Sequence, residues 1–134
     1  MTPLKTDVMP IRSSQDVVLV RQAVRAWSAE LKFSLVEQTK MVTAASELAR
    51  NTLEYGGGGN VTLQMVQDGI RKGLRLSFED QGPGIPDVDL ALRDGYTSGG
   101  GMGLGLGGSK RLVNEFEIVT KVGEGTRVTV TRWK

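Results

Sequence analysis

Cysteine and histidine are both absent from this chain of 134 residues. Without cysteine there can be no disulfide bond and no thiolate metal site. Without histidine there is no imidazole metal ligand, no histidine general base and no residue that could carry phosphohistidine. Any chemistry in this chain therefore has to do without thiols and imidazoles.

Long apolar runs are missing as well, and the net charge is small. No run approaches the roughly 20 apolar residues of a membrane-spanning helix, and the first residues lead into no signal-peptide core. The net charge of +2 is too small and too dispersed to argue for nucleic acid. We therefore expect a cytoplasmic protein with no membrane and no nucleic-acid partner, folded as one domain over residues 1–134.

Two helices are predicted in the first half of the chain. Ser13 with Asp16 begins the first helix at capping-box spacing, and Ser34 with Glu37 begins the second, which runs to about Tyr55. Apolar residues three and four apart form one buried stripe on each helix. The stripe residues are Val17, Val20, Val24, Trp27 and Leu31 in the first helix and Val42, Ala45, Ala49 and Leu53 in the second.

Alternation of apolar and polar residues predicts strands elsewhere. A short strand over residues 8–12 contains Pro10, which suggests a sheet edge. Segments 61–65 and 74–78 flank Asp68-Gly69 and predict an antiparallel hairpin. The later expected elements are a short helix over 86–93, a helix over 107–114 and two strands containing Ile118, Val119 and Val122, then Val128 and Val130. This order predicts an α+β fold, a two-layer α/β sandwich with helices on one face of a mixed, mostly antiparallel sheet.

Residues 98–109 read Ser-Gly-Gly-Gly-Met-Gly-Leu-Gly-Leu-Gly-Gly-Ser and form the most unusual stretch. Glycines let backbone amides approach a ligand closely, and successive amides make a concave anion site that suits a phosphate chain. A glycine tract can equally be a flexible linker. The tract at residues 98–109 is not a P-loop, since no G-x-x-x-x-G-K-[ST] occurs. It is not a dinucleotide fingerprint either, because no βαβ unit surrounds it.

Glu47 and Asn51 are four residues apart, so they share one face of the second predicted helix. The amide oxygen of Asn51 suits Mg²⁺, an ion that takes one or two protein oxygens plus substrate phosphates. Glu47 could remove a proton from an incoming hydroxyl group or water. The alternative is a solvated helix face, which is the commoner origin of such a pair.

A hexapeptide that begins at Asp80 reads Asp-Gln-Gly-Pro-Gly-Ile and follows an alternating strand. One interpretation is an ordinary turn. The other is base recognition, in which Asp80 accepts a hydrogen bond from the amino group of adenine, where guanine would present an oxygen. Gly82 and Gly84 would then give the flat base room, and Ile85 would pack on it. Thr126 could donate a hydroxyl toward the base, or be simply a β-branched strand residue.

The order and spacing of these clusters are more specific than any one of them. They resemble the Bergerat ATP-binding fold of the GHKL superfamily, which includes gyrase, heat-shock chaperones, sensor histidine kinases and mismatch-repair ATPases. The motifs that carry this resemblance are Glu47-x-x-x-Asn51, Asp80-x-Gly82-x-Gly84, Gly101-x-Gly103-x-Gly105 and Gly125-Thr126. Segments 45–51, 79–87 and 110–116 are similar to the small serine/threonine switch kinases of partner-switching stress pathways, the RsbT type, whose near relatives are the anti-sigma-factor kinases.

This resemblance implies a site for ATP and Mg²⁺. Asn51 is expected on the metal, Glu47 as catalytic base and Asp80 on adenine, with the glycine tract as a mobile lid. The residues expected to bind the cofactor are Asn51, Asp80, Gly82, Gly84, Ile85, Gly101, Gly103, Leu104, Gly105 and Thr126. The segment from Thr97 to Ser109 contains no Arg or Lys. In anti-sigma kinases, this segment tends to carry a residue that contacts the γ-phosphate. We therefore expect Mg²⁺, together with Lys110 or Arg111, to stabilise the transferring phosphoryl group.

The resemblance also implies partners and an activity. The expected substrate is a serine or threonine of a STAS-domain antagonist or scaffold protein in a bacterial partner-switching stress pathway. Family members of the switch type also activate a metal-dependent serine phosphatase once they are released from the scaffold. The alternatives are an anti-sigma factor kinase, and a non-catalytic binding module in which ATP reshapes a partner surface. A sensor histidine kinase is disfavoured because the chain has no histidine.

Overall fold

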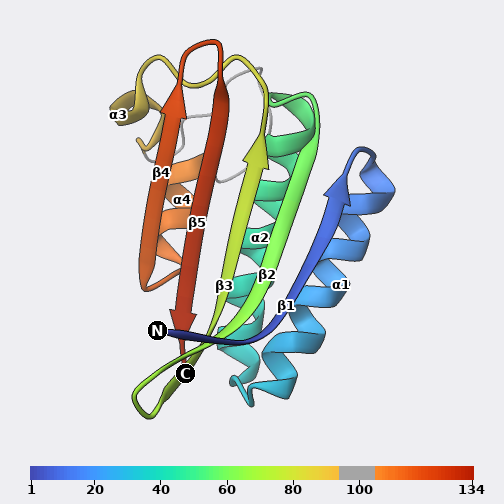
Figure 1. Ribbon diagram of the computed structural model, residues 1–134, viewed down its shortest axis with the longest axis vertical. Coiled ribbons are helices and arrows are strands. Elements are labelled where there is room, and N and C mark those ends of the chain that lie inside the picture. Colours follow the sequence, from blue (N-terminus) through green and yellow to red (C-terminus); the bar gives the residue numbers. More distant parts are fainter. Residues whose placement is uncertain (94–104) are drawn as a thin grey trace.

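The computed structural model describes residues 1–93 and 105–134 of the chain. Within them, helices and strands follow the predicted order along the sequence (Figure 1). The strands are β1 (Thr2–Ile11), β2 (Gly59–Asp68), β3 (Arg71–Asp80), β4 (Glu115–Lys121) and β5 (Gly125–Trp133). The helices are α1 (Ser14–Glu30), α2 (Leu35–Glu54), α3 (Val88–Ala91) and α4 (Gly105–Arg111). None of these helices is both long and apolar enough to cross a membrane.

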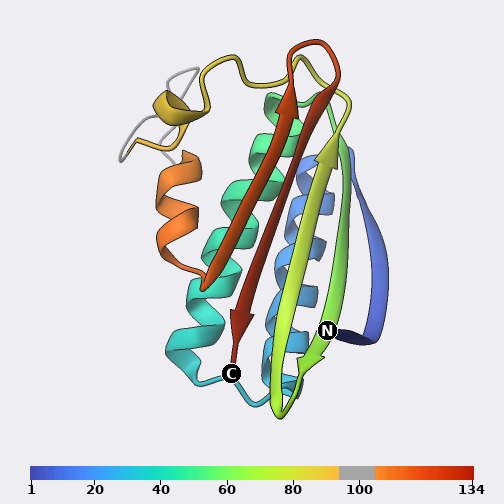
Figure 2. The same ribbon diagram turned by 60° about the vertical axis from the view of Figure 1, so that its left-hand side comes forward.

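The strands form one sheet in the order β1-β2-β3-β5-β4, and the helices cover one face of it (Figure 2). The predicted two-layer α+β sandwich is confirmed. One part of that prediction needs correction, because every strand pairing among the described residues is antiparallel and the sheet is not mixed. The β2–β3 and β4–β5 pairings are hairpins. Helices α1 and α2 connect β1 to β2, which pairs antiparallel with β1.

Strand β1 lies at one edge of the sheet, as Pro10 predicted, but it begins at Thr2 and is longer than residues 8–12. Its side chains are nearly all exposed until Ile11. A strand of this kind carries little apolar alternation, and for this reason the sequence pattern missed its first half.

The core lies between the inner face of the sheet and the apolar stripes of α1 and α2. The predicted stripes are confirmed, with Val17 and Leu53 only partly buried at the margin of the core. From the sheet, the alternating residues Val61, Leu63, Leu74, Leu76 and Phe78 are buried against them. Full burial of each such side chain contributes about 1.5–3 kcal/mol. This packing fixes α2, and with it Glu47 and Asn51, against the sheet.

The two predicted helix starts are formed, with one difference. At α2 the full capping box is present: Glu37 N donates to Ser34 Oγ at 3.1 Å, and Ser34 N donates to Glu37 Oε1 at 2.9 Å. At α1, Asp16 N donates to Ser13 Oγ at 3.2 Å. The Asp16 carboxylate, however, accepts from Arg12 N and not from the cap residue.

Helices α3 and α4 are shorter than predicted. Helix α3 covers only Val88–Ala91, capped by the Asp87 carboxylate, which accepts from Leu90 N at 3.0 Å. Helix α4 begins at Gly105 and ends at Arg111, three residues before the expected end. It stops there because Asn114 is engaged by β5: its N–H donates to Thr131 O, and its side-chain oxygen accepts from Trp133 N at 2.6 Å.

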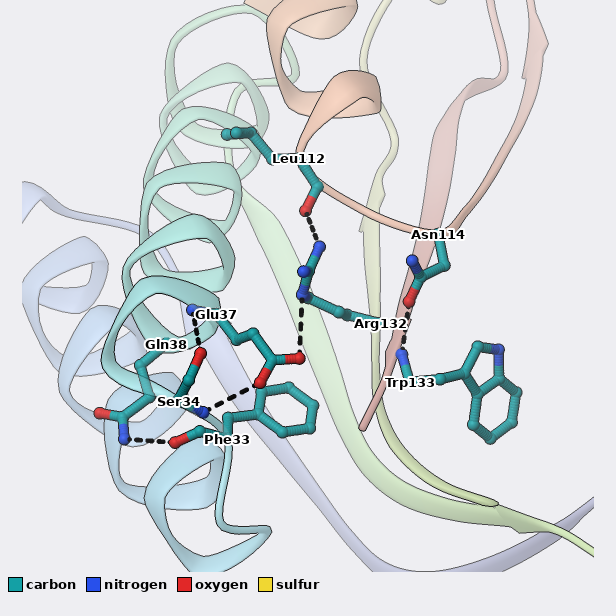
Figure 3. A network of polar contacts seen from close by, with 8 residues as sticks. All are labelled: Phe33, Ser34, Glu37, Gln38, Leu112, Asn114, Arg132 and Trp133. Carbon is teal, nitrogen blue, oxygen red and sulfur yellow. Dashed lines mark hydrogen bonds and ion pairs between the residues drawn. The ribbon is translucent and has the colours of Figure 1, made fainter.

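Arg132 joins the start of α2 to the end of β5 (Figure 3). Its Nη1 donates to Leu112 O at 3.0 Å, and its Nε lies 3.9 Å from Glu37 Oε2. The hydrogen bond from the Ser34 backbone, with help from the Ser34 hydroxyl, Arg132 and Lys134, lowers the pKa of Glu37, although partial burial opposes the shift. The Glu37 carboxylate therefore serves the helix cap and this inter-element contact at once.

We predict that Glu37→Gln destabilises the fold in a pH-dependent way. The pKa of Glu37 is lower in the folded chain than in the unfolded one, so its charge stabilises the fold at neutral pH and this contribution is lost as the pH falls through the folded pKa. Glutamine keeps an acceptor for the Ser34 N–H but loses the charge.

Urea unfolding at about pH 7 and about pH 3.5 measures this effect, because an unperturbed Glu titrates near pH 4.3. The difference in unfolding free energy between the native chain and Glu37→Gln should shrink at the lower pH. Glu117→Gln, at an exposed position of β4, is the matched control. A pH-independent difference would contradict the contribution of the charge.

Candidate functional site

A cavity of about 490 Å³ lies at the end of the sheet where α2 ends, β3 ends and β5 begins. These three segments meet at the upper end of the molecule in Figure 1, with α3 beside them. The size of the cavity falls in the range typical of small-molecule sites, about 300–1,000 Å³. Its lining comes from segments far apart in the sequence, which is the arrangement the motif order predicts.

Glu47 and Asn51 both line this cavity from α2, one helical turn apart. Glu47 is only 8% exposed, and Asn51 is half-buried. Within the described residues, the side-chain amide of Asn51 makes no hydrogen bond. The helix therefore presents a carboxylate and an unpaired amide group side by side to the cavity.

Arg50 also lines the cavity and forms an ion pair with Glu47 through its Nη2. The arginine side chain is 43% exposed, whereas that of Glu47 is 11% exposed. Sequence reasoning missed this residue. The signal was present in the spacing, since a residue three positions after Glu47 lies on the same helix face.

Asp80 lies at the end of β3 and lines the same cavity. Its Oδ1 accepts from Gly82 N at 2.9 Å, which orients the carboxylate. A side chain on Gly56 would overlap the Asp80 carboxylate, so the glycine is what allows the end of α2 to approach it. The second carboxylate oxygen of Asp80 has no hydrogen-bond partner among residues 1–93 and 105–134.

Gly84 and Ile85 line the cavity, whereas Gly82 does not. The expected role of these glycines, room for a flat base, stays a prediction, and the structure shows a second role for them. A Cβ on Gly82 would lie 2.7 Å from Gly56 Cα, and one on Gly84, whose φ is +77°, would overlap the carbonyl of Lys121. Both glycines let the loop after β3 pack on neighbouring backbone, and Gly82 contributes its N–H to Asp80.

Thr126 lines the cavity from β5, and its hydroxyl belongs to a short polar chain. Its Oγ1 lies 2.8 Å from Thr120 Oγ1, which accepts from Ile85 N and donates to Gly125 O at 3.2 Å. Either threonine hydroxyl can donate in this contact, so the expected donation from Thr126 toward the base stays a prediction. Thr120 was missed because only the pairing of β4 with β5 places it opposite Thr126.

The start of α4 completes the described lining. Gly105, with φ of +68°, and Leu106 both line the cavity. Three further positions expected at the cofactor, Gly101, Gly103 and Leu104, lie outside the described residues.

The charges around the cavity are mostly negative. Arg50 is the one Lys or Arg in the described lining, and the carboxylates there are Glu47, Glu54, Asp80 and Asp87. Lys110 and Arg111, expected near the phosphates, are in the last turn of α4 and do not line the cavity. Within the same described ranges, no group of three or more acidic residues could hold a metal alone. Among the described lining residues, Arg50 is therefore the side chain that can offset part of this negative charge.

Comparison with known proteins agrees with this arrangement. The family described as Histidine kinase-, DNA gyrase B-, and HSP90-like ATPase matches residues 36–134. The chain is 44% identical over 123 residues to the serine/threonine-protein kinase RsbT of Bacillus subtilis, covering 92% of both chains. It is 27% identical over 126 residues to an anti-sigma F factor of Clostridium kluyveri, covering 91% of this chain and 89% of the relative.

Two solved structures share the fold. The RsbU and RsbW domains of a Mycobacterium tuberculosis protein match with a TM-score of 0.67 and 22% identity, over 99% of this chain and 34% of that one. The mycobacterial sensor histidine kinase MprB matches with a TM-score of 0.58 and 17% identity, over 96% of this chain and 97% of that one. From the family match and the identity to the Bacillus kinase, the chain belongs to the histidine kinase-, DNA gyrase B- and HSP90-like ATPases, and among them to the serine/threonine kinases of the RsbT type.

Proposed function

We propose that this serine/threonine kinase of a partner-switching system transfers the γ-phosphate of ATP to a serine or threonine of a STAS-domain antagonist or scaffold protein. The observation that carries the proposal is that Glu47, Asn51 and Asp80 line a single cavity although they come from different elements. The likeness to the Bacillus kinase and to anti-sigma factors supports the pathway.

Asp80 is the residue we assign to adenine. One of its oxygens is held by the Gly82 N–H, and the other is left for the exocyclic amino group of the base. The hydroxyl-bearing Thr126 and the apolar Ile85 line the same cavity. Guanine would place a carbonyl against the carboxylate, leaving a buried acceptor unpaired, so the site should select ATP over GTP.

The donor set of the cavity fits a magnesium ion shared with the nucleotide. Asn51 presents an unpaired amide oxygen, and Mg²⁺ usually takes one or two protein oxygens together with substrate phosphates. The carboxylate surplus of the lining also favours a bound cation beside the phosphates. When bound, the ion would supply charge neutralisation on the phosphate oxygens.

We assign the role of general base to Glu47. In the transfer, the substrate hydroxyl oxygen forms a bond to the γ-phosphorus as the bond from that phosphorus to the bridging oxygen of ADP breaks, and the electron pair leaves with ADP. The hydroxyl proton passes to the Glu47 carboxylate. Partial burial of Glu47 limits the water that could compete as nucleophile.

The same proposal covers the partners and the setting. We assign residues 1–134 to one kinase domain that works in the cytoplasm, where it meets the STAS-domain protein and, once released, activates a metal-dependent serine phosphatase. The support is the likeness over nine-tenths of the chain to a switch kinase, together with anti-sigma factor relatives.

Asp80→Asn should weaken ATP binding at least about tenfold, since a carboxamide replaces the charged acceptor for the adenine amino group. Isothermal titration calorimetry with ATP and Mg²⁺ measures this change. Asp89→Asn, exposed on α3 outside the cavity lining, is the matched control. An unchanged ATP affinity in Asp80→Asn would rule out the base-reading assignment.

Asn51→Ala should remove the magnesium dependence of ATP binding. Titrations of ATP with Mg²⁺ and with EDTA give two affinities, and their ratio should fall toward one in the variant because the protein ligand of the ion is gone. Asn60→Ala, exposed at the start of β2, should keep the native ratio. If Asn51→Ala keeps it too, the ion is held elsewhere.

Glu47→Gln should bind ATP but transfer phosphate about 10²–10⁴ times more slowly, because the amide cannot accept the hydroxyl proton. Transfer of labelled γ-phosphate to a STAS-domain protein from the same genome measures the rate, with Glu117→Gln as control. Transfer at the native rate would exclude Glu47 as base. ATP binding without transfer by the native chain to any such protein would leave the nucleotide-controlled binding module.

A further inference from the structure

Arg50 differs from the other described lining residues in its positive charge. It stands on α2 between Glu47 and Asn51, and it is the one Lys or Arg in the lining that the structure describes. Its side chain lines the cavity and is 43% exposed, so it remains accessible to a bound group.

The ion pair with Glu47 uses only part of the guanidinium. Arginine carries five N–H donors in a planar fork, and the contact to Glu47 Oε1 is made through Nη2. Within the described ranges Arg50 has no second partner. Most of its donors therefore remain for a planar or tetrahedral oxyanion in the cavity, and phosphate is such a group.

The charges around the cavity are mostly negative, so a bound phosphate needs a nearby cation. The site lies at the C-terminal end of α2, where the helix dipole is negative, and the last turn of that helix contains no basic residue. The carboxylates of Glu47, Glu54 and Asp80 add to that negative potential. A terminal phosphate brought beside Glu47 would meet repulsion from all of them, and Arg50 is the described side chain able to offset it.

We propose that Arg50 binds the terminal phosphate of ATP while it holds Glu47, and so acts as a catalytic residue for phosphoryl transfer. One guanidinium would then orient the base and neutralise the transferring group, placing the proton acceptor next to the reaction centre. This inference rests on the proposed function and assigns the γ-phosphate contact to α2, in place of Lys110 or Arg111 on α4.

Comparison of ATP with ADP tests the proposal without any protein partner. Arg50→Met and Arg50→Lys are titrated by calorimetry with each nucleotide in Mg²⁺. Arg50→Met should bind ADP within about twofold of the native chain but ATP at least about tenfold more weakly, because only ATP carries the group that Arg50 contacts. Arg50→Lys keeps the charge but loses the planar fork of N–H donors, so its ATP affinity should lie between those of the native chain and Arg50→Met.

Lys40→Met is the matched control, since Lys40 lies on the same helix outside the cavity lining. It should keep the native affinity for both nucleotides. Equal losses of ATP and ADP affinity in Arg50→Met would show that Arg50 only supports the structure of the pocket, and would overturn the inference. Native affinities for both ATP and ADP in Arg50→Met would overturn it as well, and the proposed function would stand. Failure of the native chain to bind ATP would overturn both.

Discussion

The cavity depends on the close approach of three backbone segments around Asp80. A side chain at Gly56 would overlap the Asp80 carboxylate, one at Gly125 would overlap the Asp80 carbonyl, and one at Gly82 would press on Gly56. Because those side chains are missing, the end of α2, the end of β3 and the start of β5 can converge at one point. The aspartate is thereby held by backbone and not by flexible side chains, which favours a fixed direction for its free oxygen.

The ligands that this cavity can bind depend on the charges around it. Carboxylates and the negative end of α2 surround a space in which Arg50 is the single described cation. The Glu47–Arg50 ion pair holds a carboxylate and a guanidinium on one helical turn. Phosphoryl transfer in general depends on positioning and charge neutralisation more than on covalent catalysis.

Prediction from the sequence succeeded where local pattern and tertiary structure agree. The capping box at Ser34 and Glu37, and the alternating hairpin through Leu63 and Leu76, are formed as predicted. It was wrong where a long-range contact decides an element boundary. Helix α4 stops early because Asn114 is drawn to β5. The glycines after Asp80 also pack on neighbouring backbone, a contact that the sequence pattern did not reveal. The edge strand β1 was underestimated because exposed side chains carry no periodic signal.

The sequence by itself determined the fold class and the residue types available for chemistry, since periodicity, caps and the absence of histidine and cysteine are local properties. It also predicted the motif set of Glu47, Asn51 and Asp80, because their spacing is readable without coordinates. Only the tertiary structure decided that Arg50 faces the same cavity while Lys110 and Arg111 do not, and that Thr120 backs Thr126. The direction of a cation and the partner of a hydroxyl depend on how α2, α4 and the β4–β5 pair pack together, and no single stretch of sequence encodes that.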